Sequence, residues 1–427
     1  MSEGSWIIRG ARPYGEDPVE LAVRDGVFVD EAPADAQVFD ADGLIALPGL
    51  VDLHTHLREP GREDAETVET GSRAAALGGY TAVHAMANTE PVADTAGVVE
   101  QVARLGRAAG LVDVRPVGAV TVGLAGEALA ELGAMADSAA AVRVFSDDGN
   151  CVSDPLLMRR ALEYVKAFDG VIAQHAQDPR LTEHAQMNES ALSGILGMPG
   201  WPAVAEESII ARDILLAAHV RSRVHICHVS TAGSVQIIRL AKERGLPVTA
   251  EVTPHHLLLT EEKVRSYDPI FKVNPPLRTA EDVQAMREGL ADGTIDIVAT
   301  DHAPHTAETK DCEWGAASPG MLGLQSALPV VIESMVQPGL LDWRGVADRM
   351  SSAAARIGRL EGHGGDLVPG TPANLLLLDP EARTVVEPGQ LASRGRNTPY
   401  QGMTLPGRIV ATFLRGSATV LDGKAQR

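Results

Sequence analysis

Eight short apolar runs alternate with helix-like stretches through the middle of the chain, and this alternation limits the possible folds more than any other feature. The runs end in polar residues and read LPGLVDLHTHL, YTAVHAMAN, VDVRPVGAVT, AAVRVFSDD, GVIAQHAQ, RVHICHVST, LPVTAEVTPHH and IDIVATDHAPH. Stretches such as ETVETGSRAAALGG and GSVQIIRLAKERG lie between them and have helical spacing. Apolar strands that alternate with amphipathic helices predict a parallel sheet buried on both faces. Eight such units predict an α/β fold of the (β/α)8 barrel type, followed by helix at roughly residues 323–360.

Both ends of the chain have a different pattern, in which short β-like runs are separated by Gly, Asp and Pro. SWIIRGARPY and VELAVRDGVFVDE lie near the start, and ANLLLLDP and RIVATFLRGSATVLDG lie near the end. We therefore predict that residues 1–50 and 363–427 join into one small β-sandwich domain, and that residues 51–362 form the barrel.

Composition excludes several classes of function. The 427 residues carry a formal net charge of −20, which disfavours nucleic acid and anionic membranes as partners. An anionic substrate would therefore need local cations. The three cysteines form no CxxC pair, so neither a disulfide framework nor a zinc finger is expected. Without a signal-like start or an apolar run of membrane-spanning length, a cytoplasmic protein is the expectation.

Polar residues suited to metal binding follow the apolar runs. In barrels of this type the active-site residues project from the C-terminal ends of the strands. His54 and His56 are two residues apart, so on a strand both imidazoles face the same side. His175, His228 and Asp301 occupy the corresponding ends of later strands. Each one alone could be structural, but their joint pattern predicts a metal site with nitrogen and oxygen ligands, which suits zinc, manganese or cobalt.

The pair Asp147 and Asp148 in FSDDG has two interpretations. It could form a turn before Gly149, as aspartate often does. It could also supply a carboxylate that bridges two divalent ions, because four neutral histidines and one aspartate leave such a pair short of negative charge. Other residues near the predicted strand ends, His225, His255, His256, Cys151 and Cys312, are interpreted as structural or incidental.

These motifs are similar to those of a known family. HTH on the first strand, His on the fifth and sixth and Asp on the eighth resemble the amidohydrolase superfamily, and PGLVDLHTHLREPG, AMANTEP, FSDDG, HVST, NPPLR and DHAPH resemble the type I dihydroorotases. The resemblance implies two zinc ions, with Asp148 as the bridge and Asp147 as a weaker candidate. Dihydropyrimidinases, hydantoinases and allantoinases usually place a carboxylated lysine there, and AAVRVFSDDGN contains no lysine.

The resemblance also implies an activity and its residues. The expected reaction is reversible hydrolysis of dihydroorotate to N-carbamoyl-aspartate by a metal-bound hydroxide, a step of pyrimidine (UMP) biosynthesis. Asp301 would be the catalytic acid and base. The residues expected to bind substrate are Arg58, Asn88 and His305 at its carboxylate, Asn274 near its ring, and the backbone at Pro319 and Gly320. The loop at residues 306–318 is expected to be a mobile lid.

Two alternatives stay open. The chain could be a hydantoinase, dihydropyrimidinase or allantoinase, but most substrates of these enzymes lack the carboxylate that Arg58 would bind. It could also be a partner-dependent or scaffold subunit of an aspartate carbamoyltransferase complex, although every expected metal ligand is present. A homodimer is expected from the resemblance alone.

Overall fold

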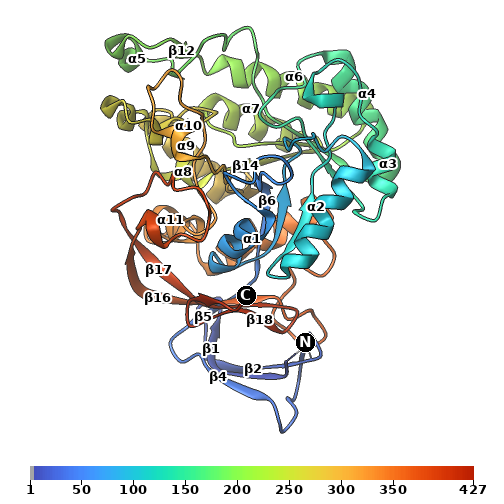
Figure 1. The fold of residues 1–427 in the computed structure, drawn as a ribbon, viewed down its shortest axis with the longest axis vertical. Helices are drawn as coiled ribbons and strands as arrows, with labels where there is room; N and C mark the ends of the chain where they lie inside the picture. The colour runs from blue at the N-terminus through green and yellow to red at the C-terminus, as the bar shows by residue number, and fades with distance from the viewer. Residues whose placement is uncertain (1–3) are drawn as a thin grey trace.

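Residues 4–427 are described by the computed structural model, and helices lie around the central strands of its larger part (Figure 1). These strands are parallel and close into a ring. The strands are β6 Leu50–Thr55, β7 Tyr80–Ala85, β8 Asp113–Pro116, β9 Val144–Phe145, β10 Val171–Gln174, β13 Val224–Ile226, β14 Val248–Val252 and β15 Ile297–Val298. They form two arcs, β6-β7-β8 and β9-β10-β13-β14-β15. Parallel bridges between Gly118 and Phe145 and between Thr55 and His302 join the arcs. The predicted (β/α)8 barrel is confirmed.

Helices surround this ring, as the periodicity predicts. The longer ones are α1 Val68–Leu77, α2 Ala96–Ala109, α4 Pro155–Val165, α6 Val204–Val220, α7 Ala232–Glu243 and α9 Ala280–Asp292. Shorter ones are α3 Leu132–Asp137, α5 Ala191–Leu196, α8 Pro254–Leu258 and α10 Ala307–Lys310. After the eighth strand come α11 Ala327–Val331, α12 Trp343–Ala347 and α13 Ala353–Gly358, with π-helical turns at Ile332–Val336 and Asp348–Ser352.

Local sequence sets where several helices begin. Thr67 accepts the amide of Thr70 at the start of α1, and Thr279 accepts the amide of Asp282 at the start of α9. Asp154 caps α4 in the same way, directly before Pro155. Such side chains satisfy amide groups that the first helical turn leaves unpaired. These caps fix the loops that follow the strands, and those loops carry the polar residues.

The two ends of the chain share one nine-stranded sheet. The N-terminal strands are β1 Trp6–Pro13, β2 Val19–Arg24, β3 Val27–Val29, β4 Gln37–Asp40 and β5 Ile45–Pro48, and the C-terminal strands are β16 Leu375–Val385, β17 Thr404–Leu414, β18 Ser417–Leu421 and β19 Lys424–Ala425. β5 pairs antiparallel with β16, with Leu375 opposite Pro48. Trp6, Phe28 and Phe413 belong to the apolar core of this small domain. The predicted β domain built from both ends is confirmed, whereas the boundaries at residues 50 and 362 stay a prediction.

The β domain adjoins the N-terminal ends of the barrel strands. β5 is followed after one residue by β6, and Asp113 at the start of β8 binds Arg415 in the β17–β18 turn. Figure 1 shows this sheet below the barrel. The C-terminal strand ends therefore lie on the far side, where an active site is expected. Within residues 4–427, the structure has no helix that combines the length and the apolar character needed to cross a membrane.

The predicted lid, residues 306–318, contains α10 and packs against the barrel's C-terminal side. Trp314 shares a buried apolar cluster with Met187, Leu192 and Val264. Its indole nitrogen donates to the carbonyl of Gln186 at 3.2 Å. The loop thus covers the short insertion that contains β11 Met187–Asn188 and β12 Gly200–Trp201. Its mobility stays a prediction.

Candidate metal centre

Six residues predicted as metal ligands lie together at the C-terminal ends of the strands. His54 is on β6, and the others follow the ends of β6, β9, β10, β13 and β15, as His56, Asp148, His175, His228 and Asp301. All six are buried, with at most 5% of any residue exposed. They form two groups of possible ligand atoms, and Asp148 belongs to both.

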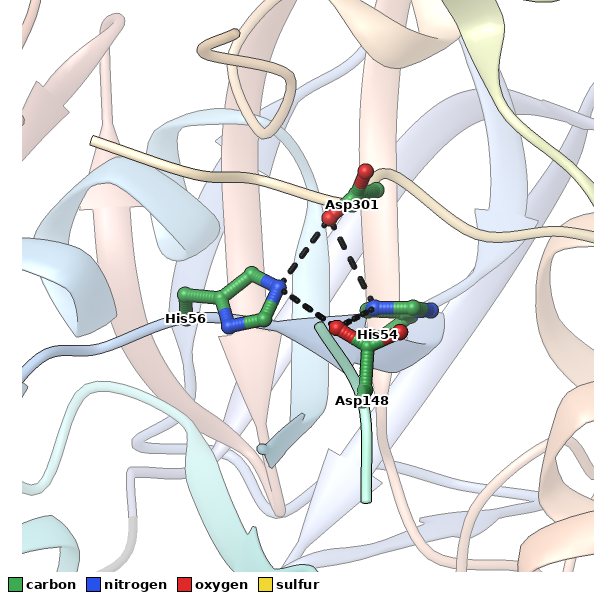
Figure 2. A group of neighbouring side chains, drawn as sticks. All are labelled: His54, His56, Asp148 and Asp301. Carbon is green, nitrogen blue, oxygen red and sulfur yellow. Dashed lines mark hydrogen bonds and ion pairs between the residues drawn. The ribbon is translucent and has the colours of Figure 1, made fainter. Parts of the chain in front are cut away.

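The first group joins two histidines and two carboxylates (Figure 2). The Nε2 atoms of His54 and His56 each lie 3.3 Å from Oδ2 of Asp148. The same two nitrogens lie 3.5 and 3.1 Å from Oδ1 of Asp301. Figure 2 shows the two carboxylates approaching the imidazole nitrogens from opposite sides.

The second group uses the other oxygen of Asp148. Its Oδ1 lies 3.2 Å from Nδ1 of His175 and 3.2 Å from Nε2 of His228. These two nitrogens are 2.9 Å apart. Oδ2 of Asp148 therefore faces the first group and Oδ1 faces the second. This is the arrangement expected of a bridging ligand.

Hydrogen bonds on the outer side of the imidazoles indicate what the inner side can bind. Nδ1 of His54 lies 2.6 Å from Oε1 of Glu251, and Nδ1 of His56 lies 2.8 Å from Oδ1 of Asn88. Nε2 of His175 lies 2.7 Å from Oε1 of Gln177. Because these oxygens accept, each ring donates outward and turns a lone pair inward.

Those inward lone pairs face carboxylate oxygens, which also only accept. Nε2 of His54 is fully buried and has no hydrogen-bond partner in the described structure. Lone pairs and negative oxygens at this separation repel each other unless cations lie between them. The donor set of imidazole nitrogens and carboxylate oxygens therefore fits divalent metal ions.

The electrostatics of the protein alone agree with this fit. Burial opposes charging of His54, but the charges of Asp148, Glu251 and Asp301 outweigh it and hold its pKa well above the ordinary value. Burial likewise opposes ionisation of Asp301, yet His54 and His56 lower the pKa of that carboxyl to about 2. In the protein alone the carboxylates thus favour a proton on His54, and a bound cation would displace that proton and take the inward lone pair as its ligand.

Asp147 turns away from the histidines. Its carboxylate accepts the amides of Val120 and Thr121 at 2.8 and 2.9 Å, and it also accepts the Thr121 hydroxyl. These bonds tie the loop after β9 to the loop after β8. Of the two adjacent aspartates, only Asp148 is placed to contact both histidine groups.

Four of the predicted substrate-binding residues gather beside this centre. Nε of Arg58 donates to the carbonyl of Pro304 at 3.1 Å, and one of its terminal nitrogens lies 3.5 Å from Nε2 of His305. That His305 nitrogen donates to the carbonyl of Pro319 at 2.8 Å. Gly320 has a φ of +144°, and a Cβ there would lie 2.7 Å from His305, so a side chain at this position would clash with the imidazole.

Burial sets the charge states of Arg58 and His305. Burial lowers the pKa of Arg58 to about 10, which leaves the guanidinium charged at neutral pH. Burial and the neighbouring Arg58 lower the pKa of His305 to about 2, so this imidazole is neutral. The one N–H of the neutral His305 is used by Pro319, so the charged donor of this cluster is the buried Arg58 guanidinium, a group suited to binding a carboxylate.

The two predicted asparagines make contacts that sequence reasoning did not foresee. The carbonyl oxygen of Asn88 is taken by His56, which leaves only its NH2 end for a substrate. Nδ2 of Asn274 donates to Oε1 of Gln177 at 3.2 Å, and its Oδ1 is buried without a partner among the described residues. Asn274 is thereby linked through Gln177 to His175.

Glu251 is the most important residue that the sequence analysis missed. It lies on β14, is 1% exposed, and contacts both His54 and His225. With Cys227 it forms a further buried group on the outer side of His54. Burial raises the pKa of the Cys227 thiol, so this sulfur stays protonated and packs as an apolar group. A glutamate inside an otherwise apolar strand was the available signal for a buried charge partner.

A family model and two bacterial relatives agree in how they are described. A family model described as Dihydro-orotase-like matches residues 43–234. A dihydroorotase of Streptomyces coelicolor is 67% identical over 423 residues, covering 98% of this chain and 99% of its own. A dihydroorotase of Mycobacterium tuberculosis is 57% identical over 426 residues, with 98% and 99% covered.

Solved structures show the same fold in related enzymes. The L-hydantoinase (dihydropyrimidinase) of Arthrobacter aurescens superimposes with a TM-score of 0.87 at 25% identity, covering 99% of this chain and 98% of its own. A dihydropyrimidinase of Brevibacillus agri has a TM-score of 0.83 at 20% identity, over 99% and 96% of the two chains. Identity over the full length to the bacterial dihydroorotases, together with a buried His and Asp cluster at the strand ends, shows that this chain belongs to the dihydroorotase family.

Proposed function

We propose that this chain catalyses the reversible hydrolysis of dihydroorotate to N-carbamoyl-aspartate, a ring-opening step of de novo pyrimidine biosynthesis. The observation that carries this assignment is the buried Arg58, whose guanidinium interacts electrostatically with Asp301 and Asp148 of the histidine and aspartate cluster. A carboxylate on the ring distinguishes dihydroorotate from dihydrouracil. A guanidinium shielded from water is the group that would recognise it.

We propose two zinc ions as the metal content. His54, His56 and Asp301 would hold one ion, His175 and His228 the other, and Asp148 would lie between them. When bound, such ions polarise the scissile carbonyl and lower the pKa of the attacking water. The nitrogen and oxygen donor set supports zinc, and the absence of a lysine at Asp148 supports a bridge made by aspartate.

The protein's own groups would orient the substrate and move the proton. Arg58, Asn88 and His305 bind the carboxylate and so fix the orientation of the ring. The second set of contacts comes from Asn274 and the backbone at Pro319 and Gly320. The Asp301 carboxylate accepts the proton of the attacking water and donates it to the ring nitrogen as the C–N bond breaks. The reverse reaction uses the same groups in the opposite order.

The alternative is a hydantoinase or dihydropyrimidinase activity, as in the solved structures with the same fold. Arg58 and Asp148 argue against it, because these substrates mostly lack a carboxylate and these enzymes usually bridge their metals with a carboxylated lysine. The two candidate activities differ in whether Arg58 binds a substrate carboxylate, so substitution of Arg58 distinguishes them.

The test compares ring opening of dihydroorotate, dihydrouracil, hydantoin and allantoin by the zinc-loaded chain, with and without Arg58→Met. Turnover of dihydroorotate is expected, with a rise in its KM of about 100-fold in the variant, because losing one partner of a buried charged pair costs about 3 kcal/mol. Arg73→Met is the matched control, since Arg73 pairs with Glu69 on the exposed side of α1. Faster turnover of dihydrouracil than of dihydroorotate would reject the assignment.

Partners and location are also proposals. We place the chain in the cytoplasm as a homodimer, on the basis of its family. If the purified chain turns over none of the four rings, aspartate carbamoyltransferase added to the same assay tests for partner-dependent activity. Activity that returns with this partner would assign the chain to such a complex, and light scattering of the free chain measures its subunit number.

A further inference from the structure

Two lysines tie the loop at residues 306–318 to the segment before Asn274, and each donates to backbone carbonyls of the opposite segment. Nζ of Lys310 donates to the carbonyls of Pro269 and Lys272, at 2.9 and 3.0 Å. Nζ of Lys272 donates in the opposite direction, to the carbonyls of Trp314 and Gly315, at 2.7 and 3.3 Å. Four hydrogen bonds thus cross the same gap in both directions.

These bonds converge on the proposed substrate pocket. The carbonyl of Lys272 accepts from Lys310 and also from the amide of Gly320, at 2.9 Å. Two residues further along the chain, Asn274 donates to Gln177, which is bonded to the metal-ligand candidate His175. The position of Lys272 therefore bears on Gly320 on one side and on Asn274 on the other.

Burial of the Lys310 amine at this position is unfavourable in free energy. The residue is only 7% exposed. Burial and the facing Lys272 lower its pKa to about 7, although Asp268 and Cys312 nearby favour the charged form. A buried amine that contacts backbone carbonyls destabilises the protein unless those bonds offset its loss of hydration. The two bonds that Nζ of Lys310 donates can offset that cost while the loop is closed, and a methionine would make neither bond.

We propose that Lys310 and Lys272 form a reciprocal clasp that holds loop 306–318 closed and thereby positions Gly320 and Asn274 for the substrate. Both lysines are positioning residues, because their Nζ atoms bond to backbone carbonyls and not to the reacting groups. The kinetic part of this inference rests on the proposed function, whereas the structural part does not.

The test uses Cys312, a half-buried thiol inside the loop, as a reporter. The variants are Lys310→Met, Lys272→Met and the double variant, all in the metal-loaded full chain. Iodoacetamide labelling of Cys312, followed by peptide mass spectrometry, is expected to accelerate about 10-fold in each single variant. The KM for dihydroorotate should rise about 10-fold while kcat changes less than about 3-fold, because the clasp supports binding. The double variant should add little, since both lysines hold one contact.

Two controls separate the clasp from general destabilisation. Lys166→Met removes a lysine that donates to the carbonyl of Val220 on the outside of the barrel, and it should change neither quantity. Cys227, at 2% exposure, should stay unlabelled in every variant. An unchanged labelling rate of Cys312 in both single variants would reject the clasp. Faster labelling with an unchanged KM would reject the positioning role. If the parent chain does not hydrolyse dihydroorotate, the proposed function fails while the labelling still decides whether the clasp closes the loop.

Discussion

Adjacent aspartates have different surroundings in this protein. Asp148 faces four imidazoles, whereas Asp147 accepts two backbone amides and a threonine hydroxyl from the neighbouring loop. Successive residues point in different directions along an extended chain, so one of the pair faces the strand ends and the other faces the adjacent loop. Asp148, and not Asp147, is therefore the carboxylate that we propose as the bridge of the metal site.

Exchange of each aspartate for asparagine tests this assignment. Asp148→Asn is expected to lose at least one bound metal and about 1,000-fold in turnover, because an amide cannot bridge two cations as a carboxylate does. Asp147→Asn should keep its metal and lose about 1–3 kcal/mol in unfolding free energy, through weakened bonds to Val120 and Thr121. Metal analysis by mass spectrometry and urea denaturation measure the two effects. Normal metal content in Asp148→Asn would contradict the bridge.

Glu251 sets the orientation of His54. Its Oε1 holds Nδ1 of His54 at 2.6 Å, while Oε2 is held by Nε2 of His225 at 2.9 Å. Outer partners of this kind fix the tautomer of a metal-binding histidine and increase its basicity. The pair of histidines on one carboxylate keeps the glutamate itself in place.

Glu251→Gln is expected to weaken metal binding about 10- to 100-fold, because the neutral amide is a poorer acceptor for His54. Competition with a chromophoric chelator measures the affinity. Glu261→Gln is the control, since Glu261 is also buried but accepts from Asn188 and Ser190, away from the histidines. Equal affinities in the two variants would show that Glu251 does not act through His54.

At the scale of elements, a buried arginine joins three segments that are distant in sequence. Arg278 is the last residue of NPPLR, is 1% exposed, and donates to Ser230, to Asn188 and to the carbonyl of Trp201. Glu206, near the start of α6, accepts the amide of Ser230 at 2.9 Å. The network therefore connects the loop after β13, which carries His228, to the β11–β12 insertion.

Arg278→Met is expected to lower the unfolding free energy by about 3 kcal/mol, since it leaves several buried acceptors without a donor. Arg287→Met removes a half-buried arginine that makes a single bond to the carbonyl of Leu257, and should cost about 1 kcal/mol or less. Urea denaturation with the metals bound gives both values. A loss in Arg278→Met no larger than in the control would mean that the network does not stabilise these segments.

Across the whole molecule, one ion-pair cluster links the barrel to the β domain. Asp113 at the start of β8 accepts two bonds from Arg415, at 2.6 and 2.9 Å, and one from His363, at 2.9 Å. Burial would raise the pKa of Asp113, but the bonds from His363 and Arg415 outweigh it and hold that pKa well below the ordinary value of 3.8. The ionised carboxylate therefore favours the folded state.

A depressed folded-state pKa gives a stabilisation that is complete above the unfolded-state pKa of about 4 and declines as the pH falls below it. Asp113→Asn should therefore reduce the unfolding free energy by about 2 kcal/mol at pH 7 and by clearly less at pH 3. Asp137→Asn, an exposed change of equal charge at the end of α3, should show no such trend. Denaturation series at the two pH values test the sign, and a deficit that grows toward pH 3 would contradict it.

The sequence by itself determined the architecture and the composition of the site. Strand and helix periodicities are local, so eight alternations were readable, as were the polar residues His54, His175 and Asp301 that end particular strands. Closure of the ring then brings these ends together, which is a property of the barrel and not of any single residue. The resemblance to dihydroorotases supplied the roles in substrate binding, which stay predictions.

Only the tertiary structure decided how these residues are oriented. Local patterns did not indicate that Asn88 would hold His56, that Glu251 would hold His54, or that Asp147 would face away from the histidines. Each of these facts depends on contacts between strands that are far apart in sequence. Hydrogen bonds of buried polar groups are satisfied across the fold by whichever partner the packing brings near, and no periodicity along the chain encodes that partner.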